Sequence, residues 1–286
     1  MYSYNTLKEL EELSNKAKIE VWKIIQKSDM EENGRTEEKS FGKMKIMYEA
    51  MKEADKNYDG NLKSASKRAG GDGEKLHKYN KENKNICGEF IGLVMEKAIK
   101  MGESNACMKR IVAAPTAGAC WVLPAVLISY QEHFNIEDEI MIKAMYVAAG
   151  IGKVIATNAF IAGAAGGCQA EIGSASAMAA GALAFLQGGK VREIINAAAL
   201  ALKNMLGLTC DPVAGLVEVP CIKRNSYGAV NAVTSTQLAM AGIESAIEPD
   251  DVIDSMRRIG NSMSPCLKET STGGLAVTES AKNYLK

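Results

Sequence analysis

Three cysteines lie in segments where glycine or proline interrupts an otherwise helical pattern. They are Cys168 within Gly163–Gly173, Cys210 within Leu206–Pro212 and Cys221 within Val219–Asn225. Turns of this kind expose backbone N–H groups and leave the thiol at the end of an element, where a thiolate can be stabilised. Cysteine thiolates are the usual ligands of iron–sulfur clusters. Three of them would hold a four-iron cluster and leave one iron open for Lewis-acid chemistry, whereas an electron carrier would normally use a fourth thiolate.

The spacing of these cysteines leaves plainer interpretations open. Separations of 42 and 11 residues match no compact ligand motif, and a free cysteine is among the most buried residue types. Seven cysteines, an odd number, in a chain of 286 residues argue against a framework of disulfides. Buried thiols, a reactive thiol and a metal site therefore all remain possible on spacing alone.

Glu171 is the only charged residue between Val154 and Gly189. A lone carboxylate in apolar surroundings must be paired, neutralised or functional. The alternative is a carboxylate that caps the helix expected from residue 173, since negative charge is favourable at a helix N-terminus.

The elements that must position these residues are predicted to be helices. Apolar residues recur every three or four positions and two-residue alternation is almost absent, so the sequence predicts an all-α fold with long glycine-rich loops. The expected helices cover residues 6–28, 36–54, 88–100, 136–149, 173–187, 190–205, 228–243 and 250–259. Residues 55–88 are polar and are expected to form a long loop. Residues 1–60 are expected to pack as charged helices on a core formed by residues 61–286.

The overall charge excludes several classes of partner. Basic and acidic side chains are equal in number, 34 of each, so no net charge attracts the chain to nucleic acid or to an anionic membrane. Three uncharged runs, 111–131, 172–189 and 225–243, have the length of a transmembrane helix. The first contains two prolines and the others are rich in Ala, Gly, Ser and Thr, which predicts small-residue helices packed inside a soluble protein.

The N-terminal residues bear on the compartment. The first 13 residues contain Lys8 and three glutamates and have no apolar segment. We therefore expect no signal peptide and place the chain in the cytoplasm.

Four strings of residues resemble the iron–sulfur-dependent L-serine dehydratases, also called L-serine deaminases, in their α subunit or α domain. The strings are Arg110–Gly118, Gly167–Met178, Leu206–Cys221 and Leu267–Thr270. The resemblance extends from about Gly70 to Thr278. It implies an all-helical catalytic domain over residues 61–286, and a lyase that converts L-serine to pyruvate and ammonia without pyridoxal phosphate. It also implies a [4Fe–4S] cluster, whose three family cysteines fall on Cys168, Cys210 and Cys221.

The resemblance suggests which residues meet the substrate. An iron bound to the serine hydroxyl would stabilise departing hydroxide, while a base removes the Cα proton. Lys268 is a candidate base or carboxylate ligand, and the alternative is a surface lysine beside Glu269. The other expected substrate-binding residues are backbone N–H donors or side chains in the family strings and turns: Thr116, Ala117, Gly118, Gly166, Gly167, Ser174 and Asn225.

The resemblance further implies a partner. The β domain of single-chain relatives, with its Ser-His-Thr motif and proposed catalytic histidine, has no counterpart in this sequence. Some relatives also end in a cysteine that caps the open iron, whereas this chain ends Asn283-Tyr-Leu-Lys286. We therefore expect the catalytic α chain of a two-subunit enzyme, which binds a β subunit and L-serine but no nucleic acid and no membrane.

Two alternatives belong to other classes. The first is a non-catalytic iron–sulfur subunit for electron transfer or assembly, against which the missing fourth ligand argues. The second is a pyridoxal-phosphate lyase, but no lysine in the sequence is marked for a Schiff base.

Overall fold

The computed structural model describes residues 2–284, and over this range the chain is built from helices and contains no strand. The prediction of an all-α fold is therefore confirmed. The helices are α1 (Leu7–Ala17), α2 (Val21–Asn33), α3 (Glu37–Lys56), α4 (Asp72–Lys81), α5 (Glu89–Ala106), α6 (Val122–Phe134), α7 (Asp138–Asn158), α8 (Gly163–Gly166), α9 (Ser174–Leu186), α10 (Val191–Asn204), α11 (Cys221–Met240), α12 (Pro249–Ser262) and α13 (Glu279–Tyr284). The short turns are η1 (Ala117–Ala119), the π-helical η2 (Gln169–Gly173), η3 (Val213–Gly215), η4 (Pro265–Leu267) and η5 (Gly274–Val277).

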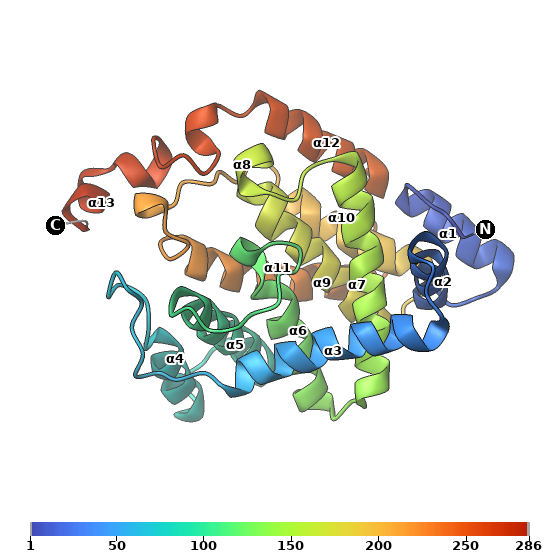
Figure 1. The fold of residues 1–286 in the computed structure, drawn as a ribbon, viewed down its shortest axis with the longest axis horizontal. Coiled ribbons are helices and arrows are strands. Elements are labelled where there is room, and N and C mark those ends of the chain that lie inside the picture. The colour runs from blue at the N-terminus through green and yellow to red at the C-terminus, as the bar shows by residue number, and fades with distance from the viewer. Residues whose placement is uncertain (1, 285–286) are drawn as a thin grey trace.

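Helix α9 lies at the centre of the bundle, surrounded by α6, α7, α10 and α11 (Figure 1). Its small residues allow this close packing. A Cβ on Gly181 would stand 2.1 Å from Cδ1 of Ile151 in α7, so a larger residue here would require the Ile151 side chain to shift. The hydroxyl of Ser176 donates to the carbonyl of Gly228 in α11 at 2.8 Å. The uncharged run 172–189 is thus an inner helix, as its composition predicted.

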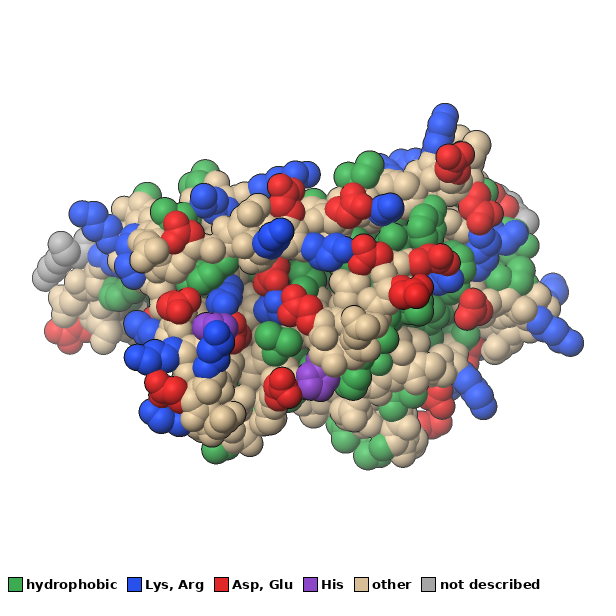
Figure 2. All heavy atoms as spheres, turned by 90° about the horizontal axis from the view of Figure 1, so that it is seen from below, with side chains coloured by type: hydrophobic (Ala, Val, Ile, Leu, Met, Phe, Trp, Pro, Cys, Tyr) green, Lys and Arg blue, Asp and Glu red, His purple; other side chains and the backbone are tan. Residues whose placement is uncertain are grey.

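Helix α7 is the one described helix that is long and apolar enough to cross a bilayer. Within its apolar window 67% of the residues are buried inside the protein, where α7 packs against α2, α3 and α9. A helix in a protein core meets the same criterion of length and composition. On the face drawn in Figure 2, acidic and basic side chains are interspersed.

Two of the helix boundaries expected near the N-terminus are wrong. The predicted helix 6–28 is two helices, because Lys18 adopts the left-handed conformation with φ 54° and ends α1. The capping box at its start is present, with the amide of Glu9 donating to the hydroxyl of Thr6 at 3.0 Å. The predicted loop 55–88 contains α4, which begins after Gly71 at φ +84°.

Helices α7 and α11 depart furthest from their expected bounds. Helix α7 continues through Gly150 to Asn158, because Gly150 serves close packing rather than termination. A Cβ there would lie 2.4 Å from Cδ1 of Ile25. Helix α11 begins at Cys221, seven residues before the expected start at 228. This earlier start places Cys221 in the first turn of a helix rather than in a free loop.

Candidate metal centre

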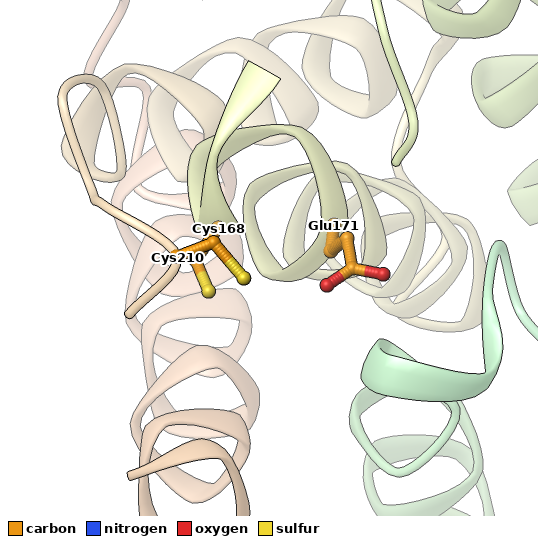
Figure 3. Close-up of side chains that lie close together, drawn as sticks. All are labelled: Cys168, Glu171 and Cys210. Carbon is orange, nitrogen blue, oxygen red and sulfur yellow. The ribbon is translucent and has the colours of Figure 1, made fainter. Parts of the chain in front are cut away.

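Three buried side chains form a compact group of possible metal ligands. The sulfurs of Cys168 and Cys210 and a carboxylate oxygen of Glu171 all lie within 4.8 Å of one another. Figure 3 shows the two sulfurs side by side, with the Glu171 carboxylate extending from the next turn of the chain. Residues 42 apart in the sequence therefore converge, as the placement of both cysteines in helix-breaking segments predicted.

The turn that carries Cys168 and Glu171 is anchored by Gln169. The amide of Gln169 donates to the carbonyl of Leu208 at 3.0 Å, and its side chain donates to the carbonyl of Met256 at 3.1 Å. Its side-chain oxygen accepts from the amide of Gly207 at 2.9 Å. Gln169 therefore joins the Cys168 turn to the Cys210 loop and to α12. No sequence pattern signalled this role of Gln169, because its three hydrogen-bond partners all lie far from it along the chain.

Cys210 is held by the segment that follows α12. Its amide donates to the carbonyl of Leu267 at 2.8 Å, and its carbonyl accepts from the amide of Glu269 at 2.7 Å. The two segments thus form a short parallel bridge between Cys210 and Lys268. The backbone of the Leu267–Thr270 string therefore positions a candidate ligand. The Lys268 ammonium makes no hydrogen bond or ion pair with any described residue, so its role as base or carboxylate ligand stays a prediction.

Cys221 is buried but does not belong to the 4.8 Å group. The side chain of Asn225 donates to the carbonyl of Cys221 and to that of Gly118, both at 3.0 Å. The first turn of α11 is thereby tied to the loop before α6. Convergence is shown for Cys168 and Cys210, and the participation of Cys221 stays a prediction.

The acidic groups of this centre disfavour one another's charged forms. The pKa of Cys210 is raised, mainly by its hydrogen bond with Cys168 and next by its burial. Burial and Cys168 raise the pKa of Cys221 to about 12. Burial raises the pKa of Glu171 in spite of the hydrogen bond from Thr116. A bound cation would reverse this preference, because ligands coordinate as anions.

Glu171 links the centre to the loop before α6. Its carboxylate accepts a hydrogen bond from the hydroxyl of Thr116 at 2.8 Å. The capping alternative is not observed, because α9 has no side-chain cap. Ala117 and Gly118 open the turn η1, and the first N–H groups of such a turn have no partner within it. The loop 116–118 lies against Glu171, since a Cβ on Gly118 would stand 2.9 Å from one of its carboxylate oxygens; the role of its N–H groups toward a substrate stays a prediction.

The remaining predicted substrate residues differ in availability. The amides of Gly166 and Gly167 donate to the carbonyls of Ala162 and Gly163, at 3.0 and 2.8 Å, within and at the end of α8. Neither N–H is free for a carboxylate in this arrangement. Ser174 Oγ and Asn225 Oδ1 are both buried without a hydrogen-bond partner. Buried polar atoms usually have a partner, so these two atoms could bond a polar group of a bound molecule, and their role in binding substrate stays a prediction.

The donor set suits an iron–sulfur cluster. Two thiols lie side by side with a third on the adjoining helix, and soft thiolates are the ligands that such clusters use. The backbone beside them has no room for a side chain. A Cβ on Gly163 would lie 2.9 Å from both the Cys210 sulfur and a Glu171 oxygen.

We therefore expect Gly163→Ala to reduce the iron that the chain holds after anaerobic reconstitution, by about tenfold, which is the scale of other losses beside a metal ligand. Iron per chain is the measurement. Gly42→Ala is the matched control, because nothing lies within 4 Å of a Cβ on this helical glycine. Equal iron in both variants would show that the Gly163 position does not shape the centre.

Comparisons of the sequence with known proteins point to one family. A family model described as "Serine dehydratase alpha chain" matches residues 16–276. The chain is 43% identical over 284 residues to the probable L-serine dehydratase alpha chain of Bacillus subtilis, covering 99% of this chain and 94% of the relative. It is 40% identical over 273 residues to the L-serine dehydratase alpha chain of Peptoniphilus asaccharolyticus, covering 95% of this chain and 94% of the relative. A longer L-serine dehydratase of Helicobacter pylori is 36% identical over 290 residues, covering 97% of this chain and 62% of the relative.

Proposed function

The chain belongs to the serine dehydratase alpha chain family, and on that premise we propose that it is an L-serine ammonia-lyase that converts L-serine to pyruvate and ammonia. The observation that carries the proposal is the buried group of Cys168, Cys210 and Glu171 beside the loop 116–118. Possible ligands for a metal lie there, beside a loop whose N–H groups we propose as donors for a carboxylate. An electron carrier would need the first of these features but not the second.

The cofactor in this proposal is a [4Fe–4S] cluster held by thiolates of Cys168, Cys210 and Cys221, with no pyridoxal phosphate. When bound, it supplies an open iron that acts as a Lewis acid toward the serine hydroxyl. Three ligands from one chain suit a cluster with one open position.

The chain's own residues orient the substrate. The N–H groups of Ala117 and Gly118 bind the serine carboxylate, and the hydrogen bond from Thr116 to Glu171 fixes their loop beside the centre. Asn225 supports the same loop through the carbonyl of Gly118. Ser174 Oγ and Asn225 Oδ1 have no hydrogen-bond partner among the described residues. In this proposal they form hydrogen bonds with polar groups of the substrate. Lys268 is the one proton acceptor that we propose on this chain.

The active enzyme in this proposal is a complex with a β chain. The relatives that cover nearly the same length are named alpha chains. The chain spans only 62% of the longer relative that is named simply L-serine dehydratase. We place the rest of the machinery, including the main base for the Cα proton, on the partner, and we treat residues 1–60 as a layer packed on the catalytic domain.

The proposal is tested by anaerobic reconstitution with iron and sulfide, followed by an assay for pyruvate from L-serine in the presence of a candidate β chain. Pyruvate formed in proportion to bound iron supports it. Borohydride treatment is the discriminating control, because it would trap a Schiff-base cofactor and leave a cluster enzyme unmodified. A reduced cofactor adduct on a lysine, detected by mass spectrometry, would contradict the proposal.

Exposure to air should abolish activity and visible absorbance together. An open iron lacks the fourth thiolate that protects electron carriers, so oxygen can reach it. We expect both signals to decay with the same time course in air and to persist under argon. Pyruvate formation that continues at its full rate after chelation in air would show that iron is not required.

A further inference from the structure

The guanidinium group of Arg224 contacts both the Cys168 and the Cys210 segments of the metal centre. Arg224 lies in the first turn of α11, three residues after Cys221. Its Nη1 atom donates to Oδ1 of Asp211 at 2.6 Å and to the carbonyl of Thr209 at 2.8 Å. The same atom lies 4.0 Å from the sulfur of Cys168. Arg224 therefore touches the residues on both sides of Cys210 and approaches the sulfur of the other ligand.

The ion pair between Arg224 and Asp211 is largely enclosed. The side chain of Arg224 is 17% exposed and that of Asp211 is 3% exposed. An enclosed charge that loses its partner destabilises the surrounding structure, whereas an exposed pair contributes little. This pair is thus a fixed part of the framework around the cysteines rather than an accidental surface contact.

Asp211 extends the connection to the C-terminal segment. Its second oxygen, Oδ2, accepts from the amide of Leu275 at 2.7 Å. A Cβ on Gly274 would stand 2.3 Å from that oxygen, and Gly274 has φ +58°. The approach of this segment therefore depends on a glycine with a left-handed conformation. A continuous path runs from the Cys168 sulfur through Arg224 and Asp211 to η5.

Several carboxylates also surround the centre. Asp211 and Glu171 are buried carboxylates. The negative charge of Glu269 adds to the effects that raise the pKa of Cys210, after those of Cys168, burial and Glu171. Binding as thiolates would add three more negative charges at Cys168, Cys210 and Cys221. A positive group beside a ligand sulfur compensates this charge and tunes the metal.

From this geometry we infer that Arg224 is a positioning residue for the iron–sulfur centre, with two separable actions. Its hydrogen bonds to Thr209 and Asp211 hold the Cys210 segment against Cys168, which slows loss of the cluster. Its positive charge beside the Cys168 sulfur raises the reduction potential of the cluster, because added negative charge is less unfavourable near a cation. The inference rests on the proposed function, since it concerns the same cluster.

Two substitutions separate these actions. Arg224→Lys keeps the charge but cannot reproduce the planar arrangement of donors, whereas Arg224→Gln removes the charge as well. We expect the lysine variant to lose iron to a chelator about tenfold faster than wild type while keeping its reduction potential. The glutamine variant should lose iron at least as fast and have a lower midpoint potential.

Lys223→Gln is the matched control. Lys223 is the preceding residue of α11, and its exposed ammonium pairs with Asp72 on α4 instead of contacting the cysteine segments. It should behave as wild type in both measurements. If Arg224→Gln and Lys223→Gln release iron at the same rate and have the same potential, the inference is overturned.

A measurement on the iron-free chain keeps the test independent of cluster assembly. We expect Arg224→Gln, and Asp211→Asn as a second variant, to speed modification of Cys168 and Cys210 by a thiol reagent, as followed by peptide mass spectrometry. Unchanged labelling rates in both variants would count against the positioning role. Wild-type protein that binds no iron would instead refute the proposed function, so the two failures are distinguishable.

Discussion

Replacing Cys210 by serine should remove nearly all bound iron and lower serine turnover about 100-fold or more, since even residues outside the ligand set change metal affinity or activity 10- to 100-fold. Cys210 and Cys168 lie in one buried group, and a serine hydroxyl is a poor substitute for a thiolate ligand of iron. The same result is expected for Cys168→Ser. Iron and sulfide per chain, with pyruvate formation in the complex, are the measurements.

The control is Cys87→Ser. Cys87 is an exposed free cysteine and lies in none of the three cysteine segments of the centre, so its replacement should leave iron content and turnover unchanged. We expect Cys107, Cys120 and Cys266 to be dispensable as well. Full iron binding by Cys210→Ser would show that another cysteine serves as the ligand, and buried Cys120 would then be examined first.

Adding a β chain should raise serine turnover by about 100-fold or more, which is the range contributed by a positioned general base. The two histidines of this chain lie away from the cysteine segments. Nδ1 of His77 is 2.7 Å from Glu96 between α4 and α5, and His133 lies beside Phe90 near the end of α6. Neither is placed to take a proton from serine at the centre. Steady-state rates with and without the partner are the measurement.

Iron content provides the control for this experiment. If the partner supplies a base, turnover rises while iron per chain of this subunit stays constant. A rise in both would indicate that the partner only stabilises the cluster. Should the reconstituted chain alone reach the full rate of the complex, the base lies in this sequence, and Lys268 would be the first residue to replace.

The sequence predicted most helices because their signals are local. The capping residues Thr6 and Glu9 mark the start of α1, and the apolar periodicity of 36–54 corresponds to α3. Helix α4 was missed because its stabilising contacts are distant in the chain. Glu103 accepts from the amides of Asp72 and Gly73 at 2.7 and 3.1 Å, which satisfies the N-terminal donors of a helix with little apolar periodicity.

The same distinction applies to the metal centre. Cys168 and Cys210 could be singled out because each interrupts a helical pattern, and Glu171 because it is isolated among uncharged residues. No sequence pattern distinguishes Arg224 or Asp211 from other charged residues, since their contacts depend on how α11 packs against the cysteine loops. The amides of Gly166 and Gly167 were expected to face a ligand, but the short helix α8 engages both of them. Sequence patterns show which residue types are available, and packing determines which atoms are free.

The most direct test of the account measures bound iron and pyruvate formation in the same samples. The reconstituted complex would be prepared anaerobically with graded amounts of iron and sulfide, and the serine-dependent rate plotted against iron per chain. We expect a proportional rise that reaches its maximum near four irons per chain, the content of one [4Fe–4S] cluster, and a rate lower by about 100-fold or more in the Cys168→Ser complex. A rate that is independent of iron, or a wild-type rate in that variant, would contradict the proposed mechanism.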